Sequence, residues 1–188
     1  MKLLPSCLVI CLVFLAGCTS SQKAQINSNQ TNSPTSSQIA SQEVKFETLK
    51  IATGQTIYVP IYSEIYFFNR TRTLQLAATL SVRNTDSQNP ITITSVRYYD
   101  SDGNLVKHHL ESPLRLAPLA STEFIVDQND QTGGSGANFI VEWVAETEVF
   151  EPILEAVMVS TTSQQGISFL SKGRVIENKA AAVTAPQQ

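Results

Sequence analysis

The stretch RTLQLAATLSVR, residues 72–83, alternates apolar and polar side chains more regularly than any other part of the chain. Its apolar residues fall at every second position from Leu74 to Val82. Successive side chains of a β-strand point to opposite faces, so this period of two predicts a strand with one buried face and one wet face. A sheet with one solvated face is typically antiparallel, so the stretch favours an antiparallel β-protein.

Similar segments lie on both sides of this stretch. The turn cluster NTDSQNP (residues 84–90) follows it, and Asp100–Asn104 (DSDGN) predicts a tight turn that closes a hairpin over residues 91–110. Pro113 and Pro118 bracket a loop or an edge strand. Residues 149–158 are also compatible with a helix. The remaining predicted strands cover residues 91–99, 105–110, 121–128, 138–146, 153–161 and 166–176.

Seven or eight short strands separated by frequent turns predict an all-β fold, namely an immunoglobulin-like antiparallel β-sandwich. The cysteine pair of antibody domains is absent, so Trp143 has to pack without a disulfide beside it. We expect this domain to occupy residues 44–177, and residues 178–188 to form a flexible tail.

The N-terminal residues differ in composition from the rest. Residues 1–17 carry one charge, Lys2, followed by an apolar run, which is typical of a secretory signal peptide. Residues 18–43 form a spacer, and 18 of the 24 residues from Thr19 to Gln42 are Ser, Thr, Asn or Gln. Such a segment buries too little apolar surface to fold, and as a coil it spans about 25–30 Å.

The composition excludes several classes of protein. The chain has 13 basic and 16 acidic residues, and removal of residues 1–17 leaves 12 − 16 = −4 charges and one cysteine, Cys18. A weakly acidic chain of this kind is not a nucleic-acid binder, a disulfide scaffold or a cysteine-based zinc protein. We expect no cofactor, no metal site and no catalytic residue.

Leu15-Ala16-Gly17-Cys18 resembles the lipobox of bacterial lipoproteins. The resemblance implies cleavage before Cys18 and a diacylglyceryl group on its sulfur, which would anchor the chain in a membrane. The alternative is an ordinary cleaved signal peptide with a chance cysteine. Thr19 stands where aspartate would favour the inner membrane of a Gram-negative cell, so the outer membrane is favoured.

The aromatic segment IYVPIYSEIYFF, residues 57–68, is the most unusual part of the folded region. Tyr58, Tyr62 and Tyr66 repeat every four residues, but Pro60 argues against one helix spanning them. One interpretation is a strand and turn that contribute to the core. The other is a binding surface for a protein or glycan, because aromatic residues with a polar tip are favoured at interfaces.

The glycine-rich run QTGGSGA, residues 131–137, is the second candidate binding element. It leads into a predicted strand and has no lysine beside it, so it lacks the context of a phosphate-binding loop. The sequence predicts a mobile hairpin loop with glycine at positive φ, or a loop that contacts a ligand. The residues assigned to that contact are Gly133, Gly134, Ser135 and Asn138.

The histidines, the turn at residues 100–104 and the acidic residues near the C-terminal strands are not predicted to form a site. Adjacent strand residues face opposite sides, so His108 and His109 cannot easily share a metal, and we expect both to face solvent. Residues 100–104 fit a plain Asp-Gly turn better than a weak cation site, because Leu105 stands where an EF-hand loop needs glycine. We expect a solvated acidic rim over Glu142, Glu146, Glu148, Glu151 and Glu155.

Several segments together resemble a bacterial family known as domain of unknown function 3124. The glycine-to-tryptophan stretch is the most specific of them, and the matches span most of residues 55–176. Members look like secreted or lipid-anchored proteins, and the family implies no activity. Many members carry histidine after the serine at position 63, where this chain has Glu64, so no histidine site is transferred. The matching stretches are Tyr58–Ser63, Leu80–Asp86, Tyr98–Asp100, Gly133–Trp143, Glu155–Met158 and Gln165–Phe169.

The sequence therefore predicts a lipid-anchored protein of the cell envelope that acts as a non-catalytic binding or accessory module. Its partner would be an envelope protein or polysaccharide. The alternatives are a structural envelope protein without a discrete ligand and, third, an enzyme, for which no motif joins a nucleophile, a base and an orienting group.

The anchor leads to a first testable prediction. Cells grown with a fatty-acid probe should label the wild-type protein and should not label Cys18→Ser, because only the thiol can form the thioether. Cys11→Ser, which removes a cysteine inside the signal peptide, is the matched control and should keep the label. An unlabelled wild type, or equal label on Cys18→Ser, would contradict the anchor.

Overall fold

The computed structural model of the chain describes residues 50–161 and 166–179. These residues form twelve β-strands and one short 3-10 turn, η2 (Gly134–Gly136), and none of them lies in an α-helix. Every strand pairing is antiparallel. The all-β antiparallel class is confirmed, with more and shorter strands than expected. The predicted signal peptide, anchor and spacer (residues 1–43) lie outside the described residues, as do residues 44–49 of the expected domain and most of the tail.

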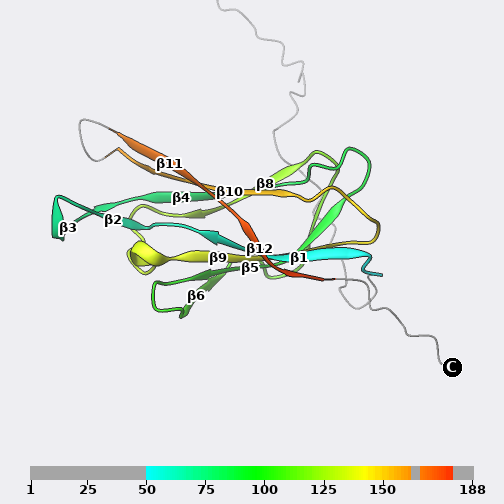
Figure 1. The fold of residues 1–188 in the computed structure, drawn as a ribbon, viewed down its shortest axis with the longest axis horizontal. Coiled ribbons are helices and arrows are strands. Elements are labelled where there is room, and N and C mark those ends of the chain that lie inside the picture. The colour runs from blue at the N-terminus through cyan, green and yellow to red at the C-terminus, as the bar shows by residue number, and fades with distance from the viewer. Residues whose placement is uncertain (1–49, 162–165, 180–188) are drawn as a thin grey trace, which may run out of the picture. The chain divides into compact units, whose positions relative to one another are not determined.

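The strands belong to three sheets (Figure 1). In the six-stranded sheet the order is β12-β1-β9-β5-β6, with β7 beside β5, and in the four-stranded sheet it is β11-β10-β4-β8. β2 and β3 form a separate hairpin at the left of Figure 1. The strands are β1 (Thr53–Pro60), β2 (Glu64–Phe67), β3 (Asn69–Gln75), β4 (Ala77–Arg83), β5 (Ile91–Tyr99), β6 (Leu105–His108), β7 (Leu114–Leu116), β8 (Ser121–Val126), β9 (Asn138–Ala145), β10 (Ile153–Ser160), β11 (Ile167–Lys172) and β12 (Arg174–Asn178).

The two larger sheets face each other, and one hydrophobic cluster fills the space between them. Ala78, Leu80 and Val82 of β4 are fully buried, whereas the residues between them are partly exposed. β9 supplies the opposite side of the core with Phe139 and Val141. The period of two in the sequence thus marks the buried face of β4, as predicted.

The predicted strand over residues 72–83 is divided at Leu76. Before this residue the chain pairs with β2, and after it the chain pairs with β8 and β10. The backbone N–H of Leu76 donates to the carbonyl of Ser63 at 2.8 Å, and its side chain is fully buried. The alternation continues across the break, so the pattern carries no signal that the strand changes its partner.

The segment 166–176, predicted as one strand, forms two strands in different sheets. The chain leaves β11 and enters β12 at Gly173, whose N–H donates to the Leu154 carbonyl at 2.8 Å. A Cβ at Gly173 would lie 2.7 Å from Cγ2 of Ile57, so only glycine fits this crossing. The helical alternative over residues 149–158 is wrong, because Ile153 begins β10.

The last residues described continue the sheet rather than leaving it. Asn178, which the sequence assigned to the tail, ends β12, and the N–H of Lys179 donates to the Gly54 carbonyl at 2.7 Å. The ammonium of Lys179 pairs with Glu142 on β9.

Asn84 holds together the loops at one end of the two sheets. Its side-chain Nδ2 lies within hydrogen-bond distance of the carbonyls of Asn89 (2.9 Å), Leu116 (3.3 Å) and Ala117 (3.0 Å). Its Oδ1 accepts from the N–H of Asp86 at 3.0 Å, and the residue is almost fully buried. An amide is needed here because the site requires both a donor and an acceptor.

Asn84→Asp should therefore destabilise the fold. The substitution keeps the shape of the side chain but turns a carboxylate oxygen towards carbonyl oxygens, at a cost of about 2 kcal/mol or more in the free energy of unfolding. Urea unfolding measures the change. Asn129→Asp, at an exposed turn position, is the control and should shift stability by less than about 0.5 kcal/mol. Equal effects of the two substitutions would contradict this role of Asn84.

Candidate functional site

Among the tyrosines of the aromatic segment, Tyr58 lies on a different surface from Tyr62. Tyr58 is half-buried on the outer face of β1, because its neighbours Ile57 and Val59 point into the core. Tyr62 follows the end of β1, is 37% exposed, and packs edge-on against Phe169 of β11 with ring centroids 5.6 Å apart. The structure therefore separates Tyr58 from Tyr62. Tyr66, on β2, is exposed.

The glycine-rich loop lies beside the segment that carries Tyr62. Pro60 pairs with Asn138 at the end of the β1–β9 ladder. Beyond it, the N–H of Ile61 donates to the Ala137 carbonyl at 2.9 Å, and the N–H of Ser63 donates to the Gly134 carbonyl at 3.1 Å. We use the name tyrosine edge for Tyr62, residues 134–138 and Tyr66, which is carried by the strand β2 that contacts η2. The structure thus places the aromatic segment and the glycine-rich run side by side, although they are far apart in the sequence.

The loop needs its glycines mainly for packing. A side chain at Gly133 would collide with the hydroxyl of Tyr98, and Gly134 has a φ of 71°. The hydroxyl of Ser101 donates to the Gly133 carbonyl at 2.8 Å and accepts from the N–H of Gly136 at 2.8 Å. These bonds hold residues 134–136 as the turn η2. The expected hairpin is wrong, because β8 and β9 on either side of the loop belong to different sheets. Gly133 is buried, so Ser135 and Gly136 are the loop residues best placed to meet a partner.

Beneath this loop lies a buried polar group. Tyr98 is fully buried, and burial, followed by the charge of Asp130, raises the pKa of its hydroxyl. The side chains of Ser63 and Thr132 lie beside the hydroxyl and oppose the shift. A phenol with a raised pKa stays protonated at neutral pH, and the buried Tyr98 hydroxyl has no hydrogen-bond partner among the residues described.

The two histidines differ, and the expectation that both face solvent is wrong. His108 is exposed, whereas His109 is half-buried and packs edge-on against Phe124 and Phe139 at centroid distances of 5.8 and 5.4 Å. Burial, followed by the charge of Lys107, lowers the pKa of His109. Its Nε2 has no hydrogen-bond partner among the residues described.

The β2–β3 hairpin ends in an aromatic tip, which we define as Phe67, Phe68, Arg70 and Arg72. Phe68 is 91% exposed and has a φ of 65°, a backbone conformation rare for any residue with a large side chain. The guanidinium of Arg72 lies 5.7 Å from the centroid of its ring. An open hollow of about 650 Å³ is lined by residues 66–70. Sequence reasoning counted the two phenylalanines but missed the tip, although FFNRTR places two arginines directly after them.

A second hollow, of about 520 Å³, lies beside the start of β1. Gln55 and Trp143 face each other there across the β1–β9 pair, and both are almost fully buried. Trp143 Nε1 and Gln55 Oε1 have no partner among the described residues. One is a donor and the other an acceptor, and both residues line this hollow.

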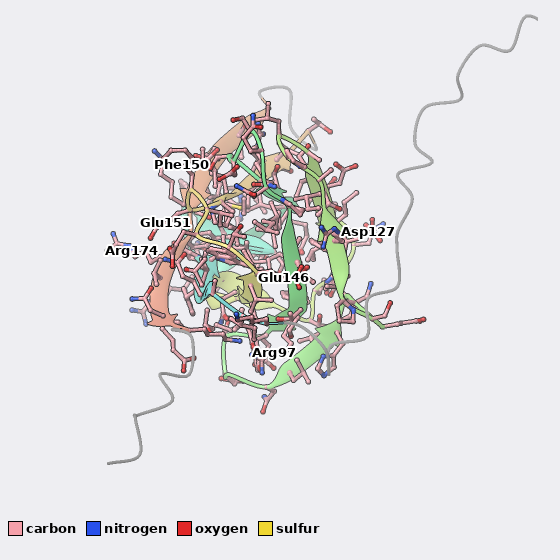
Figure 2. The ribbon with its side chains drawn as sticks, turned by 90° about the vertical axis from the view of Figure 1, so that its right-hand side faces the viewer. Arg97, Asp127, Glu146, Phe150, Glu151 and Arg174 are labelled. Atoms are coloured by element: carbon pink, nitrogen blue, oxygen red, sulfur yellow. The ribbon has the colours of Figure 1, made fainter. Side chains whose placement is uncertain are left out.

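The expected acidic rim is only partly solvated. Glu142 is half-buried and pairs with both Arg97 and Lys179, and Glu151 accepts from the Gln55 amide at 2.7 Å. Glu146 makes a looser pair with Arg115 at 3.7 Å. Figure 2 shows Arg97, Glu146 and Glu151 from the end of the sheets that lies at the right of Figure 1. Glu142 thus stabilises the sheet as well as lying near solvent.

Asp100 confirms the plain turn interpretation. Its carboxylate accepts from the N–H groups of Asp102 (2.9 Å) and Asn104 (2.7 Å), and Gly103 takes a φ of 83°. Within residues 50–161 and 166–179, no three His, Cys, Asp or Glu side chains gather in a way that could hold a metal ion. The described residues also contain no helix long and apolar enough to span a bilayer.

Comparisons with known proteins give a family but no activity. The profile described as "Protein of unknown function (DUF3124)" matches residues 54–176. None of the curated proteins matches the chain. The crystal structure of Thermotoga maritima 1070 is similar at 13% identity over 64% of this chain and 92% of that one, with a TM-score of 0.41.

The burial of His109 predicts a pH dependence of stability. The folded-state pKa of His109 is below 6.5, so the unfolded chain binds a proton first as the pH falls. The free energy of unfolding should fall as the pH drops below about 6.5. Among nearby charges, Lys107 adds to this effect and Asp130 opposes it.

Chemical unfolding at a series of pH values between 7 and about 5 measures this slope. His109→Gln should flatten it, because the buried imidazole is gone. His108→Gln, the exposed neighbour, should keep the wild-type slope. A wild-type slope in His109→Gln would show that other groups produce the dependence.

Proposed function

We propose that this chain, which belongs to the DUF3124 family over residues 54–176, is a lipid-anchored, non-catalytic binding module of the cell envelope. Its partner is an envelope protein or polysaccharide. Since the family description carries no activity, the proposal draws on the geometry of the folded region and on the N-terminal sequence pattern. The anchor is Cys18, and the outer membrane is favoured in a Gram-negative cell.

The observation that carries the binding role is the tyrosine edge. It combines exposed aromatic rings, Tyr62 and Tyr66, with the accessible backbone of residues 134–136. Rings with two rotatable bonds bury area at small entropic cost, and exposed backbone offers hydrogen bonds beside them. Because η2 is already held by Ser63 and Ser101, the edge would lose little conformational freedom on binding.

The non-catalytic part of the proposal is supported by the polar groups under the loop. Ser63 and Tyr98 carry the buried hydroxyl groups under the loop. The Ser63 hydroxyl donates to the Gly134 carbonyl at 3.1 Å rather than to a base. Nucleophilic catalysis requires the nucleophile and base within hydrogen-bond reach.

We also propose the finer fold class, an immunoglobulin-like β-sandwich. Two facing antiparallel sheets with one shared core support it, as does a buried tryptophan on a central strand. Gly173, which fits only without a side chain, lets the last two strands belong to different sheets.

A structural envelope protein without a discrete ligand is the second candidate. The packing and hydrogen bonds of the glycine-rich loop within the domain favour this candidate. Gly133 packs on Tyr98, and the carbonyl of Gly133 and the N–H of Gly136 are bonded to Ser101. A loop committed in this way contributes to stability whether or not a ligand exists.

In-cell crosslinking of the anchored protein separates the two candidates. The double variant Tyr62→Ala/Tyr66→Ala should reduce the yield of partner crosslinks at least about tenfold, as loss of interface hot spots does. Tyr62 contacts Phe169 at the surface, so the unfolding midpoint of the variant should be checked beside wild type.

Phe150→Ala is the control for loss of an exposed ring, because Phe150 is 73% exposed and lies in the loop between β9 and β10 (Figure 2). Crosslinks should persist in this variant. Unchanged crosslinks in the folded double variant would defeat the binding role of the tyrosine edge, and the absence of any partner in wild type would favour the structural candidate.

A further inference from the structure

We propose that the aromatic tip of the β2–β3 hairpin inserts into the headgroup region of an anionic lipid bilayer, as a second and reversible membrane contact. The inference deepens the proposed function, because the lipid anchor at Cys18 is what keeps the folded region close to a bilayer. It names a partner for the hairpin tip, whose hollow meets the tyrosine edge at Tyr66.

The tip exposes apolar rings at a backbone position that disfavours them. Phe68 is 91% exposed and Phe67 is 47% exposed. Phe68 also holds a φ of 65°, where glycine or asparagine would be stable at lower cost. A chain that keeps a large ring in a strained, exposed position loses stability there, and such strain clusters at functional sites.

The charges of the tip complement an anionic surface. Arg70 and Arg72 follow the rings, and neither forms an ion pair with any residue described. No acidic residue occurs between Ile65 and Thr85, although the whole chain carries a net charge of −3. The tip is therefore a local cationic site on an acidic protein, and an anionic membrane would attract this end of the domain while repelling the rest.

The polar side chains of the turn already form hydrogen bonds within the hairpin. Asn69 Oδ1 accepts from the N–H and the hydroxyl of Thr71, at 3.0 and 2.8 Å. At the base of the hairpin, the Gln75 amide donates to Glu64 at 3.1 Å. The remaining rings offer apolar contact, and the guanidinium groups can donate paired hydrogen bonds to phosphate oxygens, which are the two kinds of group that a lipid headgroup region presents. Aromatic and arginine side chains are the residues favoured at the depth of lipid headgroups.

The hairpin is also placed so that its tip can reach a surface. β2 and β3 form their own two-stranded sheet and extend away from the two larger sheets at the left of Figure 1. The loop that carries Phe150 lies at the opposite end of the strands, at the right of that figure. Phe150 is exposed like Phe68 but lies away from the arginines of the tip, so it serves as a control.

Vesicle binding by residues 19–188 tests the proposal without the anchor. This part should fold alone, because the hydrophobic core runs from Ile57 to Met158. Co-sedimentation with vesicles of phosphatidylglycerol and phosphatidylcholine should show binding, and vesicles of phosphatidylcholine alone should bind more weakly. Phe68→Asn should lower the partition coefficient at least about tenfold, since one buried phenyl ring is lost. Arg70→Gln/Arg72→Gln should lower it about tenfold, and only on the anionic vesicles.

Phe68→Asn separates membrane binding from folding. Asparagine tolerates positive φ, so its free energy of unfolding should equal or exceed that of wild type while membrane binding falls. Phe150→Ser and Arg174→Gln are the matched controls, both at exposed positions outside the tip, and should bind as wild type does.

Three results would overturn the proposal. The first is a wild-type protein that does not bind anionic vesicles, and the second is a loss of binding in Phe150→Ser as large as in Phe68→Asn. The third is unchanged vesicle binding in Phe68→Asn together with loss of a protein crosslink in cells, which would assign the tip to a protein partner. Failure of the Cys18 anchor would appear separately, as missing fatty-acid label with vesicle binding intact.

Discussion

The ring of Tyr98 lies directly against the backbone of residue 133, and this close approach fixes the geometry of one end of the domain. Glycine leaves the space that the phenol fills, so the loop can settle onto β5. Once it has settled, Ser101 and Ser63 bond to its carbonyl groups. The approach also holds the loop beside the segment that carries Tyr62, so the candidate binding surface depends on packing in the core.

The strands that could be predicted from the sequence are those whose pattern is purely local. β5 begins and ends as predicted, and β9 and β10 each end one residue before the predicted boundary. Their alternation comes from one buried face, and burial is visible in the sequence as apolar side chains. The breaks at Leu76 and Gly173 were not predicted, because the choice of a strand partner depends on residues far away in the chain.

The segments of the candidate site could also be predicted one by one, but their contact with each other could not. Composition identified the tyrosines and the glycine-rich loop separately, but their adjacency results from the pairing of Pro60 with Asn138, which no local pattern encodes. The prediction that both histidines face solvent was wrong for another reason. β6 is an edge strand that ends at His108, and its four residues are all exposed, so the strand pattern does not say where His109 turns. His109 packs against Phe124 and Phe139, which come from strands farther along the chain. Phe68 belongs to the aromatic segment, but its positive φ could not be predicted, because backbone strain leaves no mark in composition.

The position of β1 has a mechanical consequence. β1 is the first strand after the segment that would join the domain to its anchor, and it is flanked by β12 on one side and β9 on the other. A pulling force along the chain from Thr53, resisted at the far end of the sheet, would act parallel to β1. It would load both hydrogen-bond ladders in shear, so that many bonds share the force and must break together. Among the strands described, β1 is therefore the one that bears a force applied through the segment before Thr53.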